Sequence, residues 1–162
     1  MPTQKTISIS GSTGNLEGSL HLPDVAPTAI VVVAHPLPTM GGTMDNKVVT
    51  TLTKAFVELE YATLRFNFRG VGTSEGSYDA GHGETLDAIT AANYLRSEFP
   101  NLPLLLAGFS FGGYVQARAA AELNPQQLIL IAPAVGRFAM PHVPANTLLV
   151  HGDLDEVVPL ND

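Results

Sequence analysis

The sequence contains no cysteine among its 162 residues. That absence excludes a disulfide framework, a thiolate zinc site and a cysteine nucleophile. Charged residues are few, at 14%, and the net charge of −7 argues against nucleic acids and anionic membrane surfaces as partners. The longest apolar run, residues 29–34, is far too short to span a bilayer. The first residues are polar and lack the apolar segment of a secretory signal, so we expect a cytoplasmic protein.

Apolar residues are plentiful instead, at 45%, which indicates a globular protein rather than a disordered one. The length predicts a single domain over residues 1–162, able to bury about 70% of the surface that the unfolded chain exposes. No group of His, Asp and Glu has the spacing of a known metal site. We therefore expect no metal and no cofactor.

Short strands alternate with helices along most of the chain. Residues 5–10 and 16–22 flank a glycine-rich turn and predict an N-terminal antiparallel hairpin. Further strands are expected at 29–34, 62–68, 104–109, 128–132 and 147–150. This alternation predicts an α/β fold with a mostly parallel sheet and helices on both faces, and with ligands at the carboxyl ends of the strands.

Three helices are expected between these strands. The first is capped by Asp45 or Asn46 and runs to Glu60, with Leu59 on its apolar face. The second covers residues 84–98, with Leu86 on its core stripe. The third follows the strand at 104–109 and ends at Asn124-Pro125.

A Gly108-Phe-Ser-Phe-Gly112 cluster joins the strand at 104–109 to the third helix. A serine at the apex of such a turn is lifted out of the sheet above the N-terminus of the helix. The glycines fit because the turn leaves no room for side chains beside the neighbouring strand and helix. Ser110 is therefore the predicted nucleophile.

A serine nucleophile needs a base, an orienting carboxylate and an oxyanion hole. We predict Asp155 as the carboxylate, with Asp153 as the second candidate. As a histidine, His35 is a candidate for the base, but its place at the end of a strand favours a role in shaping the loop that follows. Structural or surface roles are also expected for the other histidines and for Arg69. These histidines are His21, His82, His142 and His151.

Two backbone N–H groups would stabilise the oxyanion. One belongs to Phe111, the residue after the nucleophile. The other belongs to the loop after residues 29–34, where Pro36 and Pro38 have no N–H. Leu37 is thus the first available donor in that loop.

Taken in series, these motifs resemble those of the α/β-hydrolase superfamily, in particular its small lidless bacterial members related to dienelactone hydrolases. The motifs are Gly108–Gly112, His35–Pro38 with Gly41–Gly42, Arg69–Ser74 and His151–Pro159. The resemblance implies Ser110 as nucleophile, Asp155 as the acid of the triad, and the N–H groups of Leu37 and Phe111 as oxyanion hole. It also implies hydrolysis of carboxylic esters, with thioesters, lactones or amides as further substrates.

The sequence departs from the family in one respect. Family members place a histidine after the acid, on a loop that follows one further strand. No histidine follows Asp155 here, and the usual last helix, last strand and histidine loop are absent, so we expect a C-terminally truncated version of the fold. The chain is a fragment, or a partner chain supplies the missing part, or the protein is a short homologue without a working triad. The first interpretation is favoured because the break follows a strand-end loop.

We therefore predict a serine hydrolase that cleaves small carboxylic esters through an acyl-enzyme on Ser110. The alternative is a non-catalytic module that binds acyl ligands. A nucleotide-binding protein is disfavoured because neither a P-loop nor a dinucleotide fingerprint is present. The short 133–145 loop predicts an open site, and its apolar lining would come from Phe109, Phe111, Phe138 and Met140. We expect a small-molecule ester as ligand, and leave open whether the chain forms a homodimer.

Overall fold

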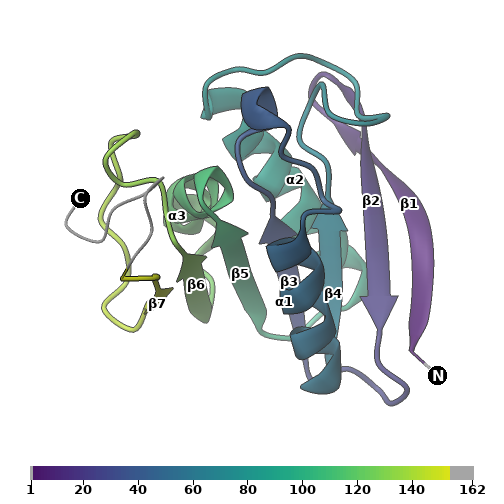
Figure 1. The fold of residues 1–162 in the computed structure, drawn as a ribbon. Coiled ribbons are helices and arrows are strands. Elements are labelled where there is room, and N and C mark those ends of the chain that lie inside the picture. Colours follow the sequence, from purple (N-terminus) through teal and green to yellow (C-terminus); the bar gives the residue numbers. More distant parts are fainter. Residues whose placement is uncertain (1, 154–162) are drawn as a thin grey trace.

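A mixed seven-stranded sheet organises the chain in the computed structural model, which describes residues 2–153 (Figure 1). The strand order is β1-β2-β4-β3-β5-β6-β7. In chain order the elements are β1 (Thr3–Gly11), β2 (Gly14–Leu22), β3 (Ala29–Ala34), a 3-10 helix (Pro38–Met40), α1 (Lys47–Glu58), β4 (Tyr61–Phe66), α2 (His82–Glu98), β5 (Leu104–Phe109), α3 (Phe111–Leu123), β6 (Gln127–Ile131) and β7 (Leu148–Val150).

The sheet joins an antiparallel edge to a parallel body. β1 and β2 form the expected hairpin, closed by the pair Gly11 and Gly14, and β2 continues antiparallel along β4. From β4 through β3, β5 and β6 to β7 every pairing is parallel. The carboxyl ends of these five strands therefore meet at one edge, and the predicted fold class is confirmed.

Helices cover both faces of the sheet, because successive side chains of β3 point to opposite faces and all of them are buried. Ile30 and Val32 point into the larger hydrophobic cluster, which includes residues of α2 and α3. Val31 and Val33 point into a smaller cluster under α1. Because β3 is fully buried on both sides, its sequence is a continuous apolar run rather than an alternating one. Among residues 2–153, no helix is long and apolar enough to cross a membrane.

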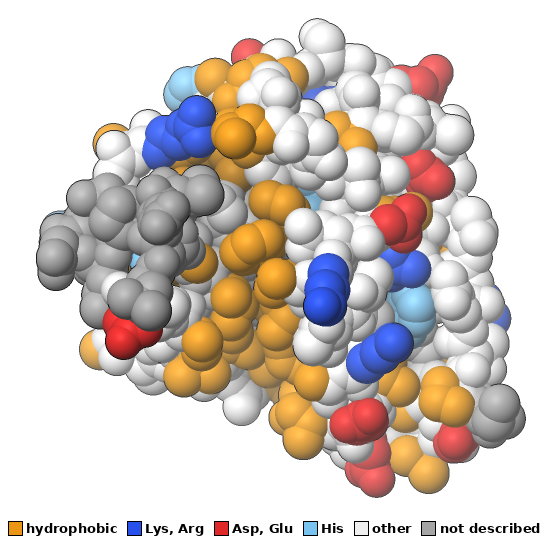
Figure 2. Space-filling model, in the orientation of Figure 1, with side chains coloured by type: hydrophobic (Ala, Val, Ile, Leu, Met, Phe, Trp, Pro, Cys, Tyr) orange, Lys and Arg blue, Asp and Glu red, His pale blue; other side chains and the backbone are white. Residues whose placement is uncertain are grey.

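The two faces differ in how completely they are covered. α2 and α3 lie side by side behind the sheet, whereas α1 lies alone in front of β3 and β4 (Figure 1). Hydrophobic side chains gather beside α1 on the front of the molecule (Figure 2). The half-buried members of the smaller cluster are Leu52, Tyr61, Leu105 and Ile131.

The predicted helix α1 needs two corrections. It begins after Asn46, whose side chain accepts hydrogen bonds from Val48 N and Val49 N, as the capping prediction allowed. It ends at Glu58 rather than Glu60, and Leu59 is 57% exposed instead of buried. The buried residues of the helix are Val49, Thr53 and Phe56, and Leu59 is the C-cap residue, beyond the last residue of the helix.

The predicted core stripe of α2 was also wrong at Leu86, which is 49% exposed. The helix turns its small residues and two carboxylates, Glu84 and Asp87, toward the protein. α2 begins at His82, earlier than expected, which places that histidine on a helix rather than in a loop. β4 ends at Phe66, two residues before the predicted end.

Candidate active site

The turn at Ser110 connects β5 directly to α3. Ser110 has backbone angles φ 54° and ψ −116°, in the region that residues other than glycine rarely occupy. A Cβ atom at Gly112 would overlap the carbonyl of Ala34, and one at Gly108 would overlap the carbonyl of Gly112. The strand–turn–helix predicted from the glycine spacing is therefore present, and it depends on both glycines.

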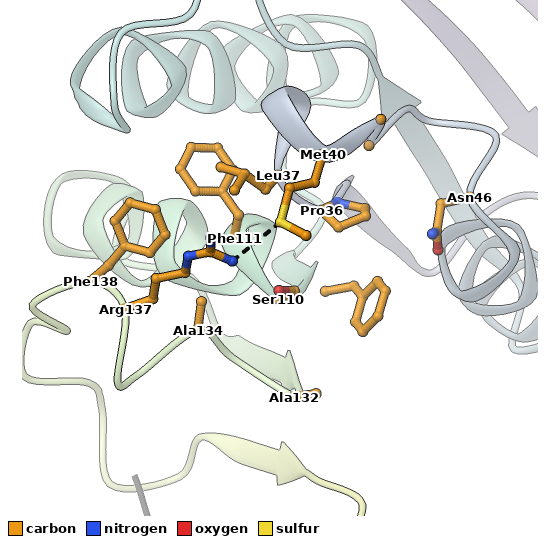
Figure 3. A pocket seen from close by; sticks show the side chains of 13 residues that line it. Pro36, Leu37, Met40, Asn46, Ser110, Phe111, Ala132, Ala134, Arg137 and Phe138 are labelled. Atoms are coloured by element: carbon orange, nitrogen blue, oxygen red, sulfur yellow. Dashed lines mark hydrogen bonds between the residues drawn. The ribbon is translucent and has the colours of Figure 1, made fainter. Parts of the chain in front are cut away.

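Backbone hydrogen bonds hold Ser110 from two sides. Its N–H donates to Ile131 O at 2.9 Å, and its carbonyl accepts from Gly113 N at 3.0 Å and Ala134 N at 3.3 Å. The side chain is half-buried and lines a cavity of about 270 Å³. Figure 3 shows the hydroxyl facing this cavity between the loop after β3 and the loop after β6.

Gln116 links the helix under Ser110 to the two strands beside it. Its Nε2 donates to Val32 O in β3 and to Ala107 O in β5, each at 3.1 Å. The side chain is fully buried, and within residues 2–153 its Oε1 has no hydrogen-bond partner. This amide fixes α3 relative to β3, the strand that leads to the loop with Leu37.

His35 shapes the loop after β3. Its ring is fully buried, with Nδ1 2.7 Å from Pro36 O and Nε2 accepting from Phe68 N at 3.1 Å. Burial lowers the pKa of His35 to about 4, and the hydrogen bond to Pro36 O opposes that shift only in part. The ring is neutral at pH 7 and both nitrogens are occupied, so His35 is not a base for Ser110.

Leu37 and Phe111 both line the cavity that Ser110 faces. The carbonyl of Leu37 is turned into its own loop, where it accepts from Met40 N at 3.1 Å and Gly42 N at 3.0 Å. Phe111 is the first residue of α3, where a backbone N–H has no acceptor within the helix. In the part of the chain that the structure describes, neither N–H donates a hydrogen bond.

The predicted acid follows β7 in the chain. Asp155 lies outside the described residues. β7 pairs with β6 in parallel, with Val150 beside Ile131, so its carboxyl end is at the same edge as Ser110. Asp153, the second candidate, is exposed shortly after that strand end.

Arg69 braces its loop, as expected. Its guanidinium and its own backbone N–H both bind the Asp87 carboxylate, with Nη2 2.8 Å from Oδ1 and the backbone N 2.9 Å from Oδ2. Both side chains are buried. The hydrogen bonds to Asp87 raise the pKa of Arg69, and burial opposes that rise. Arg69 is absent from the cavity lining.

The other histidines lie elsewhere. His21 accepts from Arg65 Nε at 3.1 Å in a separate pocket beside α1, and burial together with Arg65 lowers its pKa to about 4. His82 contacts Arg118 at the start of α2. His142 is exposed, and His151 is half-buried just after β7. No group of three His, Asp or Glu residues in the described chain could hold a metal ion.

Sequence reasoning missed part of the cavity wall. Met40 and Asn46, from the loop after β3, line the cavity, and so does Arg137 from the loop after β6. Phe109, Phe111 and Phe138 line it as expected, but Met140 does not. In the sequence, Arg137 could have been found only by its position a few residues after a strand, at the edge where the carboxyl ends of the parallel strands meet.

Comparisons with known proteins agree with this geometry. The family model described as serine aminopeptidase, S33 (Hydrolase_4), matches residues 25–159. An uncharacterised protein of Rickettsia prowazekii is 33% identical over 173 residues, covering 96% of this chain and 69% of that protein.

Two solved structures are similar over nearly the whole chain. A lidless α/β serine hydrolase from Xanthomonas campestris is 46% identical, with a TM-score of 0.93, over 98% of this chain and 75% of that chain. An α/β serine hydrolase homologue from Coxiella burnetii is 41% identical, with a TM-score of 0.92, over 97% and 77% of the two chains.

Proposed function

Because this chain belongs to the serine aminopeptidase S33 (Hydrolase_4) family, within the α/β-hydrolase superfamily, we propose that it is a serine hydrolase cleaving small carboxylic esters through an acyl-enzyme on Ser110. The observation that carries the proposal is the turn at Ser110. It presents a strained, half-buried hydroxyl to a cavity that Leu37 and Phe111 also line.

In the proposed reaction the Ser110 Oγ attacks the ester carbonyl carbon and its proton passes to a base. The carbonyl oxygen becomes an oxyanion, which accepts hydrogen bonds from the N–H groups of Leu37 and Phe111. Collapse of this intermediate expels the alcohol, which takes a proton from the base, and leaves the acyl group on Ser110. Water then attacks the acyl-enzyme by the same steps and releases the acid.

Asp155 is the proposed carboxylate that orients the base. In the related enzymes the base is a histidine that follows this acid, and no histidine follows Asp155 in the sequence. His35 is excluded by its hydrogen bonds to Pro36 O and Phe68 N. The proposal therefore rests on Ser110 and its surroundings rather than on a complete triad.

The cavity favours small acyl groups. Its volume is about 270 Å³, at the lower end of the range for small-molecule sites. Phe109, Phe138 and Met40 give it an apolar lining, which suits a short acyl chain. We expect acetate to butyrate esters to be cleaved faster than long-chain esters, which an acyl-chain-length series would measure. A preference for long chains would contradict this.

A second candidate is a module that binds acyl ligands without turning them over. It is favoured by one observation: the hydrogen bonds of His21, His35 and His82 all go to groups other than the Ser110 hydroxyl. In that case Ser110 would only line a pocket, and its removal would leave ligand affinity nearly unchanged.

Labelling with a fluorophosphonate, which modifies activated serines, separates the two candidates. The intact mass of the protein is measured before and after the reaction. We expect one adduct on Ser110, no adduct in Ser110→Ala, and full labelling of a matched control, Ser97→Ala, whose hydroxyl is exposed on α2. Folded protein that acquires no adduct, or an adduct that persists in Ser110→Ala, would contradict the proposed hydrolase.

A further inference from the structure

Arg137 is the only charged side chain among the described residues that line the Ser110 cavity. It belongs to the loop after β6, and its Nη1 lies 3.2 Å from the sulfur of Met40 (Figure 3). Met40 belongs to the loop after β3, so the arginine reaches toward the opposite wall. Its head group points toward Met40 across the cavity, and the residue is exposed to solvent (Figure 3).

The loop holds Arg137 in this position. The N–H groups of Arg137 and Phe138 both donate to Ala134 O, at 3.3 Å and 3.1 Å. The ring of Phe138 stacks on Tyr114 with centroids 4.7 Å apart, and it contacts Phe111 at 5.3 Å. Because its neighbour is anchored to α3, the backbone of Arg137 is fixed although the side chain is exposed.

Among the described residues, the Arg137 guanidinium donates to no carboxylate. In residues 2–153 the salt bridges join Arg65 to Asp45 and Arg69 to Asp87, and Arg137 takes part in neither. Arg96 and Arg118 donate to oxygen atoms, of Leu123 and Tyr114. Arg137 instead faces a thioether, which is a weak acceptor. A ligand that replaces the contact between Arg137 and Met40 therefore gives up little binding free energy.

We propose that Arg137 selects substrates that carry a carboxylate a few bonds from the ester carbonyl, such as half-esters of short dicarboxylic acids. The inference rests on the proposed function, since it names the substrate class of the same site. A guanidinium binds a carboxylate through two parallel hydrogen bonds, and apolar walls strengthen that interaction by excluding water. The net charge of −7 does not attract anions, and Arg137 is the one positive side chain among the described residues that line the cavity.

Binding is measured first, because it does not depend on turnover. The Ser110→Ala variant of the full chain is titrated with monomethyl succinate, which is anionic, and with dimethyl succinate, which is neutral. We expect the monoester to bind about tenfold more tightly, and we expect added salt to reduce this ratio. Adding Arg137→Gln should remove the preference and leave the affinity for the diester unchanged. Arg96→Gln, remote from the cavity, serves as the matched control for a lost positive charge.

Turnover of the same two esters then separates this inference from the proposed function. If the monoester binds preferentially but neither ester is cleaved, hydrolysis fails and anion recognition stands. If both are cleaved but bound equally before and after Arg137→Gln, anion recognition is overturned and hydrolysis stands. Failure of the monoester to bind, or a preference for it that survives Arg137→Gln, also overturns the role of Arg137.

Discussion

The two sides of the Ser110 cavity are built differently. One side consists of the turn at Ser110 and the loop after β3, where buried backbone meets buried backbone at Gly42, Gly108 and Gly112. The other side is the loop after β6, where Arg137 and Phe138 reach the cavity with side chains that are exposed or half-buried. On the first side, which holds Ser110, the backbone is packed so closely that added side-chain atoms are not tolerated. The second offers contacts that substitution can alter without disturbing Ser110.

Gly112→Ala should test the rigid side most severely. The added methyl would overlap the carbonyls of Ala34 and His35, and neither backbone group can move without shifting β3. We expect a loss of at least about 2 kcal/mol in the free energy of unfolding, together with loss of labelling at Ser110. Gly152→Ala, where an added Cβ meets no atom of residues 2–153 within 4 Å, is the control and should change neither. Wild-type stability in Gly112→Ala would show that this side is less rigid than we infer.

A drop in pH should weaken the same side through His35. Its pKa is about 4 in the folded protein and 6.5 as the ordinary value. Between these values the unfolded chain binds more protons than the folded one, so stability is present above pH 6.5 and falls as the pH is lowered toward 4. The full difference amounts to about 3 kcal/mol. Urea unfolding at several pH values between 7 and 4.5 would measure it.

His21 must be separated from His35, because its pKa is also lowered to about 4. Its ring is half-buried and water screens it in part, so we expect it to contribute less. His21→Gln should therefore retain most of the pH dependence, and His35→Asn should lose most of it. Equal pH dependence in His35→Asn and the wild type would refute this explanation.

Phe138→Ala should have a smaller effect than Gly112→Ala or the protonation of His35, since it changes only the loop after β6. The variant loses ring contacts with Tyr114 and Phe111 but leaves the turn at Ser110 intact. We expect a loss of about 1–2 kcal/mol in stability, retained labelling at Ser110, and cleavage of longer acyl chains. Val143→Ala, at an exposed position of the same segment, is the control. Loss of labelling in Phe138→Ala would mean that the two sides are coupled.

The parts of this structure that were predictable from the sequence are those with a local physical signature. The continuous apolar run of β3 matched its strand end to end, because burial on both faces leaves no polar position. The glycines around Ser110 predicted the turn because they stand between a strand and a helix, where the close packing leaves no room for a Cβ atom. The cap of α1 was predicted as Asp45 or Asn46, because both side chains can accept hydrogen bonds from the first N–H groups of a helix, and it is Asn46.

The parts that could not be predicted depend on tertiary partners. Leu86 looked like a core residue until the structure showed that Glu84 and Asp87 take the inward face of α2. Glu84 accepts from Gly81 N at 2.8 Å in a capping box at the start of α2, and Asp87 holds Arg69, 18 residues earlier in the chain, so each buried carboxylate has a partner. Arg137 was missed because a loop has no periodicity to show which way a side chain points.

The backbone angles of Ser110 affect which amino acid selection would favour at this position. A residue with a Cβ atom held at φ 54° costs on the order of 1–3 kcal/mol, and glycine would relieve most of that cost. Selection for stability alone would therefore replace the serine, and a chain with no use for the hydroxyl would drift toward glycine at this position. A serine held at these backbone angles is therefore expected only where its hydroxyl has a use that offsets the stability lost.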